Sequence, residues 1–225
     1  MKKCIVLSSG GLDSTVTMAI AKKLDYKIFA LSFDYEQRHK IEIESAIKVS
    51  KYFNVERHII LKLPIGQIGG SALTDSAIDV PEGNIHRKEI PITYVPGRNI
   101  IFLAFAVSIG EVVGAYDIFI GVNAVDYSGY PDCRSDFVKA FEYTVNKGTK
   151  AGVTGKNFKI HTPLITLSKK DIILKGKELN VDFSITTSCY NPSSNGNPCG
   201  KCDSCILRLK GFEEAGLTDP LPYMK

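Results

Sequence analysis

The sequence predicts an α/β protein, with a twisted parallel sheet that carries helices on both faces and a small cysteine-rich module at the C-terminal end. Three observations support this fold class. Short apolar runs alternate with segments of helical periodicity, a Gly-Gly turn follows the first run, and four cysteines gather late in the chain. Strand–helix–strand repeats favour right-handed crossovers, which make neighbouring strands parallel. We expect an α/β domain over residues 1–185 and the module, packed on it, over residues 186–225.

The first sixty residues predict three strands and two helices. Short apolar runs indicate buried strands, and apolar residues at helical spacing indicate the helices between them. In chain order, we expect strands over residues 4–8, 27–33 and 57–61, and helices over residues 14–24 and 36–53. Asp13 or Ser14 is a suitable N-cap for the first helix. Cys4, inside the first strand, is expected to pack in the core.

The rest of the chain continues the alternation after a long irregular segment. Residues 64–96 mix glycines, prolines and polar residues, which predicts a loop that covers the site as a lid. Beyond this loop we expect a buried apolar helix over residues 99–113, a strand over 117–122, an amphipathic helix over 135–146, a Gly/Lys loop over 149–157 and a helix over 168–179. Ser168 is expected to cap the last helix, with Asp171 in its first turn.

Composition narrows the class of partner. The formal net charge of +4 permits an anionic small molecule but lies far below the basic excess of a nucleic-acid-binding protein, so we expect no nucleic-acid partner. No apolar run approaches the roughly 20 residues that span a bilayer, which argues against a membrane partner. The apolar stretch at the N-terminus is short and is not followed by a signal cleavage site. We therefore expect a cytoplasmic protein, in which clustered cysteines favour metal over disulfides.

A glycine loop between the first strand and the first helix is the strongest pointer to a ligand. Its residues are Ser8, Ser9, Gly10, Gly11, Leu12, Asp13, Ser14, Thr15 and Val16. At this position backbone N–H groups and the helix dipole hold phosphate. We expect both glycines to take positive φ and to let the backbone approach the anion. Asp13 is better suited to Mg²⁺ or to capping. The loop lacks the ending of a Walker motif and the third glycine of the dinucleotide fingerprint.

The four late cysteines predict a metal centre. Cys189, Cys199, Cys202 and Cys205 have the spacing Cys-x₉-Cys-x₂-Cys-x₂-Cys, in a stretch so polar and turn-rich that it offers no core for them to join. Four thiolates close a tetrahedral shell around Zn²⁺, with bonds of about 2.3 Å. Because the protein fills all four positions, we expect one structural zinc per chain, whose binding is coupled to local folding.

Three further regions are too polar for packing alone. Arg98 follows a Pro-Gly turn and is suited to clamp a carboxylate or a phosphate. Lys169 opens a helix and can reach a leaving pyrophosphate. For both, a solvated surface position is the alternative. The loop after the strand at 117–122 falls where parallel sheets form their ligand crevice. From this region we predict the following substrate-binding residues: Asn123, Asp126, Tyr130, Asp132 and Arg134.

These sequence segments together resemble those of a known family. Ser9-Gly10-Gly11-Leu12-Asp13-Ser14 resembles the loop of the ATP pyrophosphatases, and the full set resembles the 7-cyano-7-deazaguanine synthase family within that superfamily. The set comprises this loop, Gln37-Arg38-His39, Pro96-Gly97-Arg98-Asn99, the segment 126–134 and the four cysteines. Glu36, where relatives often carry a small or neutral residue, and Gly97, where alanine is common, are small departures from the family pattern.

The resemblance implies a fold, a reaction and a set of cofactors. The fold is that of the adenine nucleotide alpha hydrolases, and the enzyme is a zinc-containing, ATP-dependent ligase of queuosine biosynthesis. It converts 7-carboxy-7-deazaguanine and ammonia to the 7-cyano compound through an adenylated carboxylate and an amide. The loop from Ser8 to Val16 is then expected to bind ATP with Mg²⁺, and Asp13, Arg98 and Lys169 are the candidate catalytic residues. We expect a homodimer, joined through the apolar helix or the cysteine module.

Two other functions are weighed against this one. A tRNA-thiolating enzyme with the same loop needs a catalytic cysteine and an RNA-binding extension, but only Cys133 is free near the crevice and no basic extension is present. A zinc-knuckle adaptor for nucleic acid fits neither the buried parallel sheet nor the modest charge. The sequence identifies no general base for the ligase reaction and leaves the source of ammonia open.

Overall fold

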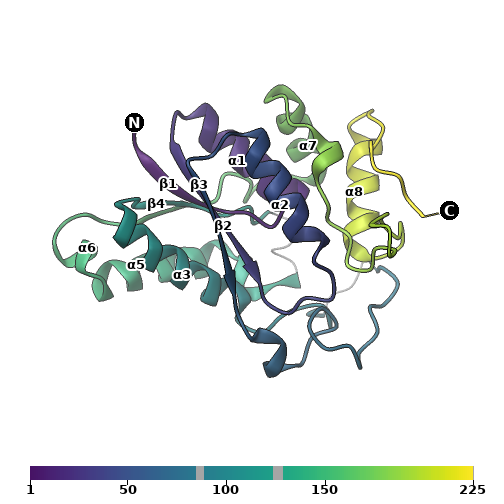
Figure 1. Cartoon of the computed structure of the whole chain (residues 1–225), viewed down its shortest axis with the longest axis horizontal. Helices are drawn as coiled ribbons and strands as arrows, with labels where there is room; N and C mark the ends of the chain where they lie inside the picture. The colour runs from purple at the N-terminus through teal and green to yellow at the C-terminus, as the bar shows by residue number, and fades with distance from the viewer. Residues whose placement is uncertain (85–88, 124–128, 225) are drawn as a thin grey trace.

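The computed structural model describes residues 1–84, 89–123 and 129–224, and it contains the predicted parallel sheet (Figure 1). The strands are β1 (Lys3–Leu7), β2 (Lys27–Asp34), β3 (Arg57–Lys62), β4 (Asp117–Phe119) and β5 (Lys159–His161). They lie in the order β3-β2-β1-β4-β5, and all four neighbouring pairs are parallel. The sequence pattern does not reveal β5, because only its central residue, Ile160, is buried.

Helices cover both faces of the sheet, as predicted (Figure 1). The α-helices of the described residues are α1 (Leu12–Lys23), α2 (Ile41–Tyr52), α3 (Arg98–Val113), α5 (Ser135–Gly148), α6 (Lys150–Val153), α7 (Lys169–Glu178) and α8 (Asp203–Glu214). Helices α3, α5 and α6 lie on one face, and α1, α2, α7 and α8 lie on the other. Helix α6 occupies part of the predicted Gly/Lys loop, and α8 is a helix that the sequence analysis does not predict.

The strand β1 divides the interior into two cores. Ile5 and Leu7 pack in the core on the α3 side, whereas Cys4 and Val6 pack in the core on the α1 side. This alternation follows from the two-residue period of a strand. Cys4 is fully buried, as predicted, and burial raises the pKa of its thiol to about 12.

Helix α2 begins five residues later than the helical period suggests. Glu36 has a φ of 64°, in the left-handed region that residues with side chains rarely adopt, so the chain cannot be helical there. The Gln37 side chain closes the resulting turn, because its Oε1 accepts from the Tyr35 amide at 2.8 Å and its Nε2 donates to the Phe33 carbonyl at 3.3 Å. The turn places Glu42 in the first turn of α2, beside the carboxyl end of β2.

Helix α3 is less buried than its composition predicts. Leu103 and Ala106 face the core and are fully buried, but Ile100, Phe105 and Val112 are 47%, 37% and 87% exposed. The apolar run therefore covers both the core-facing side and an outward side of the helix. No helix in the described residues is both long enough and apolar enough to cross a membrane.

The irregular segment after β3 lies partly against the C-terminal module. Apart from a short 3₁₀ turn at Ile65–Ile68, its described residues form neither helix nor strand. The Gly83 amide donates to the Lys201 carbonyl at 2.8 Å, and the Asn84 amide donates to Asp203 Oδ1 at 2.6 Å. The function of this segment as a lid stays a prediction.

A buried ion pair fastens the C-terminal tail to α8. The Arg208 and Asp219 side chains are each 3% exposed. Arg208 donates to both Asp219 carboxylate oxygens, at 2.8 and 3.0 Å, and to Thr186 Oγ1 at 2.7 Å. The Tyr223 hydroxyl also donates to Asp219, at 2.6 Å. The segment that precedes the cysteines and the segment that follows α8 are thus tied to the same arginine.

We expect Asp219→Ala to lower the free energy of unfolding by about 3–5 kcal/mol, because it leaves the Arg208 charge buried without its partner. Urea denaturation followed by circular dichroism measures this change. The matched control is Glu214→Ala, which removes an exposed partner of Lys210 on the same helix and is expected to cost less than about 1 kcal/mol. Equal losses in the two variants would contradict the structural role of the buried pair.

Candidate active site and metal centre

A cavity of about 230 Å³ opens at the carboxyl ends of the central strands. Its walls include residues that follow β1, β2 and β4, together with the first turns of α1, α2, α3 and α7. The strands β1 and β4 are neighbours in the sheet, and the strand order reverses direction at this pair. Open parallel sheets bind their ligands at this kind of switch point.

The loop between β1 and α1 is held in shape by its own hydroxyl groups. Ser9 Oγ lies 3.1 Å from Ser14 Oγ and accepts a hydrogen bond from the Gly11 amide at 3.3 Å. Ser14 Oγ lies 3.0 Å from the Gly11 carbonyl, within donating distance. These hydrogen bonds from its own side chains therefore order the loop, and the sequence motif alone does not reveal them.

The two loop glycines have different functions. Gly10 has a φ of 77°, as predicted, and a Cβ atom there would lie 2.5 Å from the Ala46 amide nitrogen, so glycine is required for α2 to pack on the loop. Gly11 instead has a φ of −80° and is the N-cap of α1. The expectation of positive φ is wrong for Gly11, and neither Asp13 nor Ser14 caps the helix, because α1 begins one residue before Asp13.

The first turn of α1 forms one wall of the cavity. Leu12, Asp13 and Ser14 line it, and a helix leaves the amides of its first turn without intrahelical partners. Ser8 also lines the cavity, and its hydroxyl is buried without a hydrogen-bond partner in the described part of the chain. Amides at a helix N-terminus bind phosphate, and the Asp13 and Ser14 amides are suited to this because the Leu12 amide already donates to Ser188. This wall therefore fits the phosphates of a nucleotide.

Thr15 and Val16 lie on the buried side of α1. Both are fully buried and neither lines the cavity. The Thr15 amide and hydroxyl both donate to the Gly11 carbonyl, at 3.1 and 2.8 Å, so they are already engaged in the helix.

The segment before the first cysteine crosses over the loop. The Thr187 amide donates to the Gly10 carbonyl at 2.9 Å, and the Leu12 amide donates to Ser188 Oγ at 3.3 Å. Both Thr187 and Ser188 line the cavity. Residues more than 170 positions apart in the sequence thus form one wall.

Asp13 is the centre of a polar cluster at the cavity wall. Lys169 Nζ donates to both carboxylate oxygens of Asp13, at 2.9 and 2.7 Å, and Asn123 Nδ2 donates to Asp13 Oδ2 at 3.1 Å. A lysine in the first turn of a helix is unfavourable near the positive end of the dipole. The Asp13 carboxylate compensates for this unfavourable position, and it brings two of the predicted catalytic residues into direct contact.

Arg98 lies in the cavity, and it belongs to a cluster with tyrosines and one carboxylate. It interacts with the Tyr35 hydroxyl, and Glu42 faces both groups. Burial raises the pKa of Glu42 to about 7, while the Arg98 charge opposes that rise. Burial, and then the Glu42 charge, raise the pKa of Tyr35 to about 12. At neutral pH the cavity therefore holds a neutral tyrosine, and the Glu42 carboxyl is close to half protonated.

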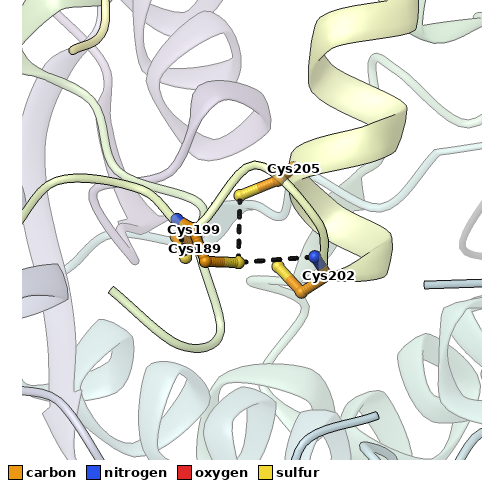
Figure 2. Close-up of side chains that lie close together, drawn as sticks. All are labelled: Cys189, Cys199, Cys202 and Cys205. Atoms are coloured by element: carbon orange, nitrogen blue, oxygen red, sulfur yellow. Dashed lines mark hydrogen bonds between the residues drawn. The ribbon is translucent and has the colours of Figure 1, made fainter. Parts of the chain in front are cut away.

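The four predicted cysteines come together at the start of α8 (Figure 2). Their Sγ atoms all lie within 4.8 Å of one another. A tetrahedral metal with bonds of about 2.3 Å separates its sulfur ligands by about 3.8 Å, so the cluster fits a metal with little adjustment. The Asn191 and Cys199 amides donate to Cys189 Sγ at 3.3 and 3.2 Å, and the Cys202 amide donates to Cys199 Sγ at 3.4 Å.

The cluster is also suited electrostatically to a cation. Hydrogen bonds from Cys189, and then from Cys205, lower the pKa of the Cys202 thiol, whereas hydrogen bonds within the cluster raise the pKa values of the Cys189 and Cys205 thiols. The backbone amides on the sulfurs favour the thiolate form in the same way. A cluster that holds a thiolate beside three further sulfurs has the donor set of a structural metal site.

Comparison with known proteins identifies the family. The chain matches the family described as "Queuosine biosynthesis protein QueC" over residues 3–216. A 7-cyano-7-deazaguanine synthase from Citrifermentans bemidjiense is 54% identical over 224 residues, which cover 100% of this chain and 99% of that protein. A protein of the same name from Acetivibrio thermocellus is 55% identical over 225 residues, with coverage of 100% and 99%.

The chain belongs to the QueC family.

Solved structures share the fold of this QueC-family chain. NMN synthetase from Francisella tularensis superposes with a TM-score of 0.51 at 18% identity, over 96% of this chain and 73% of that one. A 4-thiouridine synthetase in complex with RNA and bound ATP superposes with a TM-score of 0.50 at 20% identity, over 96% and 50%. At these identities the likeness establishes the fold and not the reaction.

The predicted substrate residues of the QueC chain differ in whether they line the cavity. Tyr130 lines it, and its hydroxyl lies 3.0 Å from Thr93 Oγ1. The Asn123 side chain holds Asp13, and Asp132 accepts a hydrogen bond from the Asn99 amide at 3.0 Å at the start of α3. Arg134 is exposed and precedes α5. Asp126 lies outside the described residues, and these substrate assignments stay predictions.

Several cavity residues of the QueC chain are missing from the sequence-based assignment. They are Tyr35, Glu42, Thr187, Ser188, Tyr190 and Arg208. Tyr35 follows the carboxyl end of β2. The rule that ligands bind beyond the carboxyl ends of parallel strands, applied above to the loop after β4, also identifies this position. Glu42 was missed because the predicted helix began at residue 36, five residues too early. In that prediction Glu42 did not fall in the first turn of the helix. Ser188 and Tyr190 flank a cysteine, but no local signal shows that this segment reaches the cavity.

Proposed function

We propose that this chain is an ATP-dependent ligase that converts 7-carboxy-7-deazaguanine and ammonia to 7-cyano-7-deazaguanine, in queuosine biosynthesis. The observation that carries the proposal is the identity of more than half of all residues, over the full length, with proteins named for this product. The cavity adds chemical support, because the helix N-terminus that follows the glycine loop and the cationic side chain of Arg98 both line it.

The proposed reaction begins with activation of the acid. The substrate carboxylate attacks the α-phosphate of ATP and pyrophosphate leaves, which gives an acyl adenylate. Ammonia attacks the acyl carbon, AMP leaves, and an amide forms. The amide oxygen then attacks the α-phosphate of a second ATP, and loss of AMP from that adenylate leaves the nitrile. Both activations depend on stabilisation of charge at phosphate.

We propose that groups of the cavity wall supply that stabilisation. In this proposal the backbone amides of Asp13 and Ser14 hold the phosphates, with Ser8 in the same cavity lining. Asp13 would hold the Mg²⁺ that accompanies ATP, which would supply charge neutralisation at the phosphates, and we propose that Lys169 pairs with the leaving pyrophosphate. Arg98 is the candidate partner of the substrate carboxylate, since its planar donor group fits a carboxylate.

The cysteine cluster is proposed to hold one structural Zn²⁺ per chain. Four thiol ligands at these distances suit zinc, and a closed set leaves no position for substrate. We propose residues 1–185 as the ATP-binding domain and residues 186–225 as the metal module packed on it. The chain is proposed to be cytoplasmic, where its cysteines stay reduced. The outward apolar side chains of α3 support a homodimer through that helix.

We expect the purified chain to form the nitrile when it is mixed with the acid, ammonium and Mg²⁺–ATP. Mass spectrometry follows the acid, the amide and the nitrile, and each nitrile is expected to accompany two AMP and two pyrophosphate. A parallel mixture of enzyme, ATP, tRNA and a sulfur donor is expected to give no thiolated base. Thiolated base without nitrile would replace this proposal with the thiolation function.

A further inference from the structure

A second, smaller cavity adjoins the large one. Its volume is about 20 Å³, and Tyr35, Gln37, Glu42 and Tyr190 line both cavities. A space of this kind holds one water-sized molecule, because about 10–15 Å³ is the minimum that such a molecule needs. The small cavity therefore has room for a molecule of one heavy atom beside the large cavity.

The wall of the small cavity offers a carboxylate as a hydrogen-bond acceptor. The Glu42 carboxylate accepts no hydrogen bond from any residue in the described ranges. His39 lines the same cavity, and burial, and then the Arg38 charge, lower the pKa of its ring, which favours the neutral form.

We infer that the small cavity binds ammonia, and that Glu42 is the base that removes protons from its nitrogen in the reaction. The inference rests on the proposed function and deepens it. Glu42 lines both cavities, so one carboxylate reaches the nitrogen before and after it bonds to the substrate carbon.

The proton balance of the reaction requires such a base. When ammonia adds to the acyl adenylate, a C–N bond forms, the C–O bond to AMP breaks, and one proton leaves the nitrogen. In the second half, the adenylated amide loses AMP as its C–O bond breaks, and two more protons leave the same nitrogen. The nitrile nitrogen has no hydrogen, so three protons leave one atom at one place. Each passes to Glu42 and from there to solvent.

Among the described residues, the other carboxylate at the wall of the large cavity is poorly suited to this task. Asp13 accepts two hydrogen bonds from Lys169 and a third from Asn123, and it lies on the phosphate-binding wall. Glu42 instead faces Arg98 and Tyr35, on the wall that also borders the small cavity. The two carboxylates thus divide between phosphate binding and proton transfer.

The test uses the full chain with Glu42→Gln, which keeps the shape of the side chain but cannot take up a proton. Acid-dependent exchange of pyrophosphate into ATP reports adenylation, which needs no base at nitrogen. Amide and nitrile formation over a range of ammonium concentrations report the later steps. Glu44→Gln is the matched control, because Glu44 lies on the same helix turn and is exposed.

We expect Glu42→Gln to retain exchange within about threefold of the wild type and to lose amide formation by about 100-fold or more, the usual contribution of general base catalysis. The KM for ammonium is expected to rise. Glu42→Asp is expected to restore part of the amide formation, and Glu44→Gln to behave as the wild type. Retained exchange also shows that the variant is folded.

Three other outcomes are informative. Amide formation at the wild-type rate in Glu42→Gln would overturn the inference. Loss of exchange with a raised KM for the acid would also overturn it, since Glu42 would then recognise the substrate ring. If the wild type itself showed no acid-dependent exchange, the proposed function would fall, and the inference with it.

Discussion

Replacement of Asp13 by alanine is expected to reduce exchange of pyrophosphate into ATP at least 100-fold, while the metal content of the chain stays unchanged. The carboxylate is in contact with Lys169 and Asn123 on the phosphate-binding wall. Its loss removes the proposed Mg²⁺ ligand and leaves Lys169 without the anion that holds it. Losses of about 10²–10³ are usual when one group that stabilises transition-state charge is removed.

Radiolabelled pyrophosphate with the acid and Mg²⁺–ATP measures this exchange, and atomic emission measures the metal. Asp136→Ala is the matched control, because Asp136 is also an aspartate in the first turn of a helix but is exposed on α5, away from the cavity. Full exchange activity in Asp13→Ala would exclude this residue from the phosphate site.

Replacement of Cys202 by serine is expected to remove most of the bound metal, to lower the melting temperature by about 10 °C and to reduce exchange activity as well. The thermal shift follows from the loss of a few kcal/mol in a chain of this length. The loss of activity follows from the position of the cluster, because Ser188, Tyr190 and Ser204 next to its cysteines line the large cavity.

Metal analysis, calorimetry and the exchange assay are made on one preparation. Cys4→Ala is the control, since Cys4 is fully buried in the core far from the cluster. It is expected to lower stability with the metal retained. One metal per chain in purified Cys202→Ser would contradict the assignment of the four thiolates.

Features that depend on a few neighbouring residues were predictable from the sequence. The loop after β1, the four cysteines and the Ser168 cap are of this kind, and the structure has the predicted capping box, with the Asp171 amide donating to Ser168 Oγ at 3.2 Å. Each follows from a local rule about helix ends, turns or ligand spacing.

Features that depend on distant contacts were not predictable. Strand β5 exists because β4 pairs with it, and its own three residues carry no period. The early start assigned to α2 failed because no rule places Glu36 in the left-handed region. Ser188 reaches the loop through a contact across 176 residues, which a single sequence does not show.

The crossing of residues 187 and 188 over the glycine loop has a consequence for biosynthesis. Residues 187 and 188 are synthesised more than 170 residues after the glycine loop, whose wall they complete. A nascent chain therefore lacks a finished wall until this later segment has emerged and folded. If the proposed function holds, metal binding and competence to bind nucleotide are expected to be reached together, in one step of maturation.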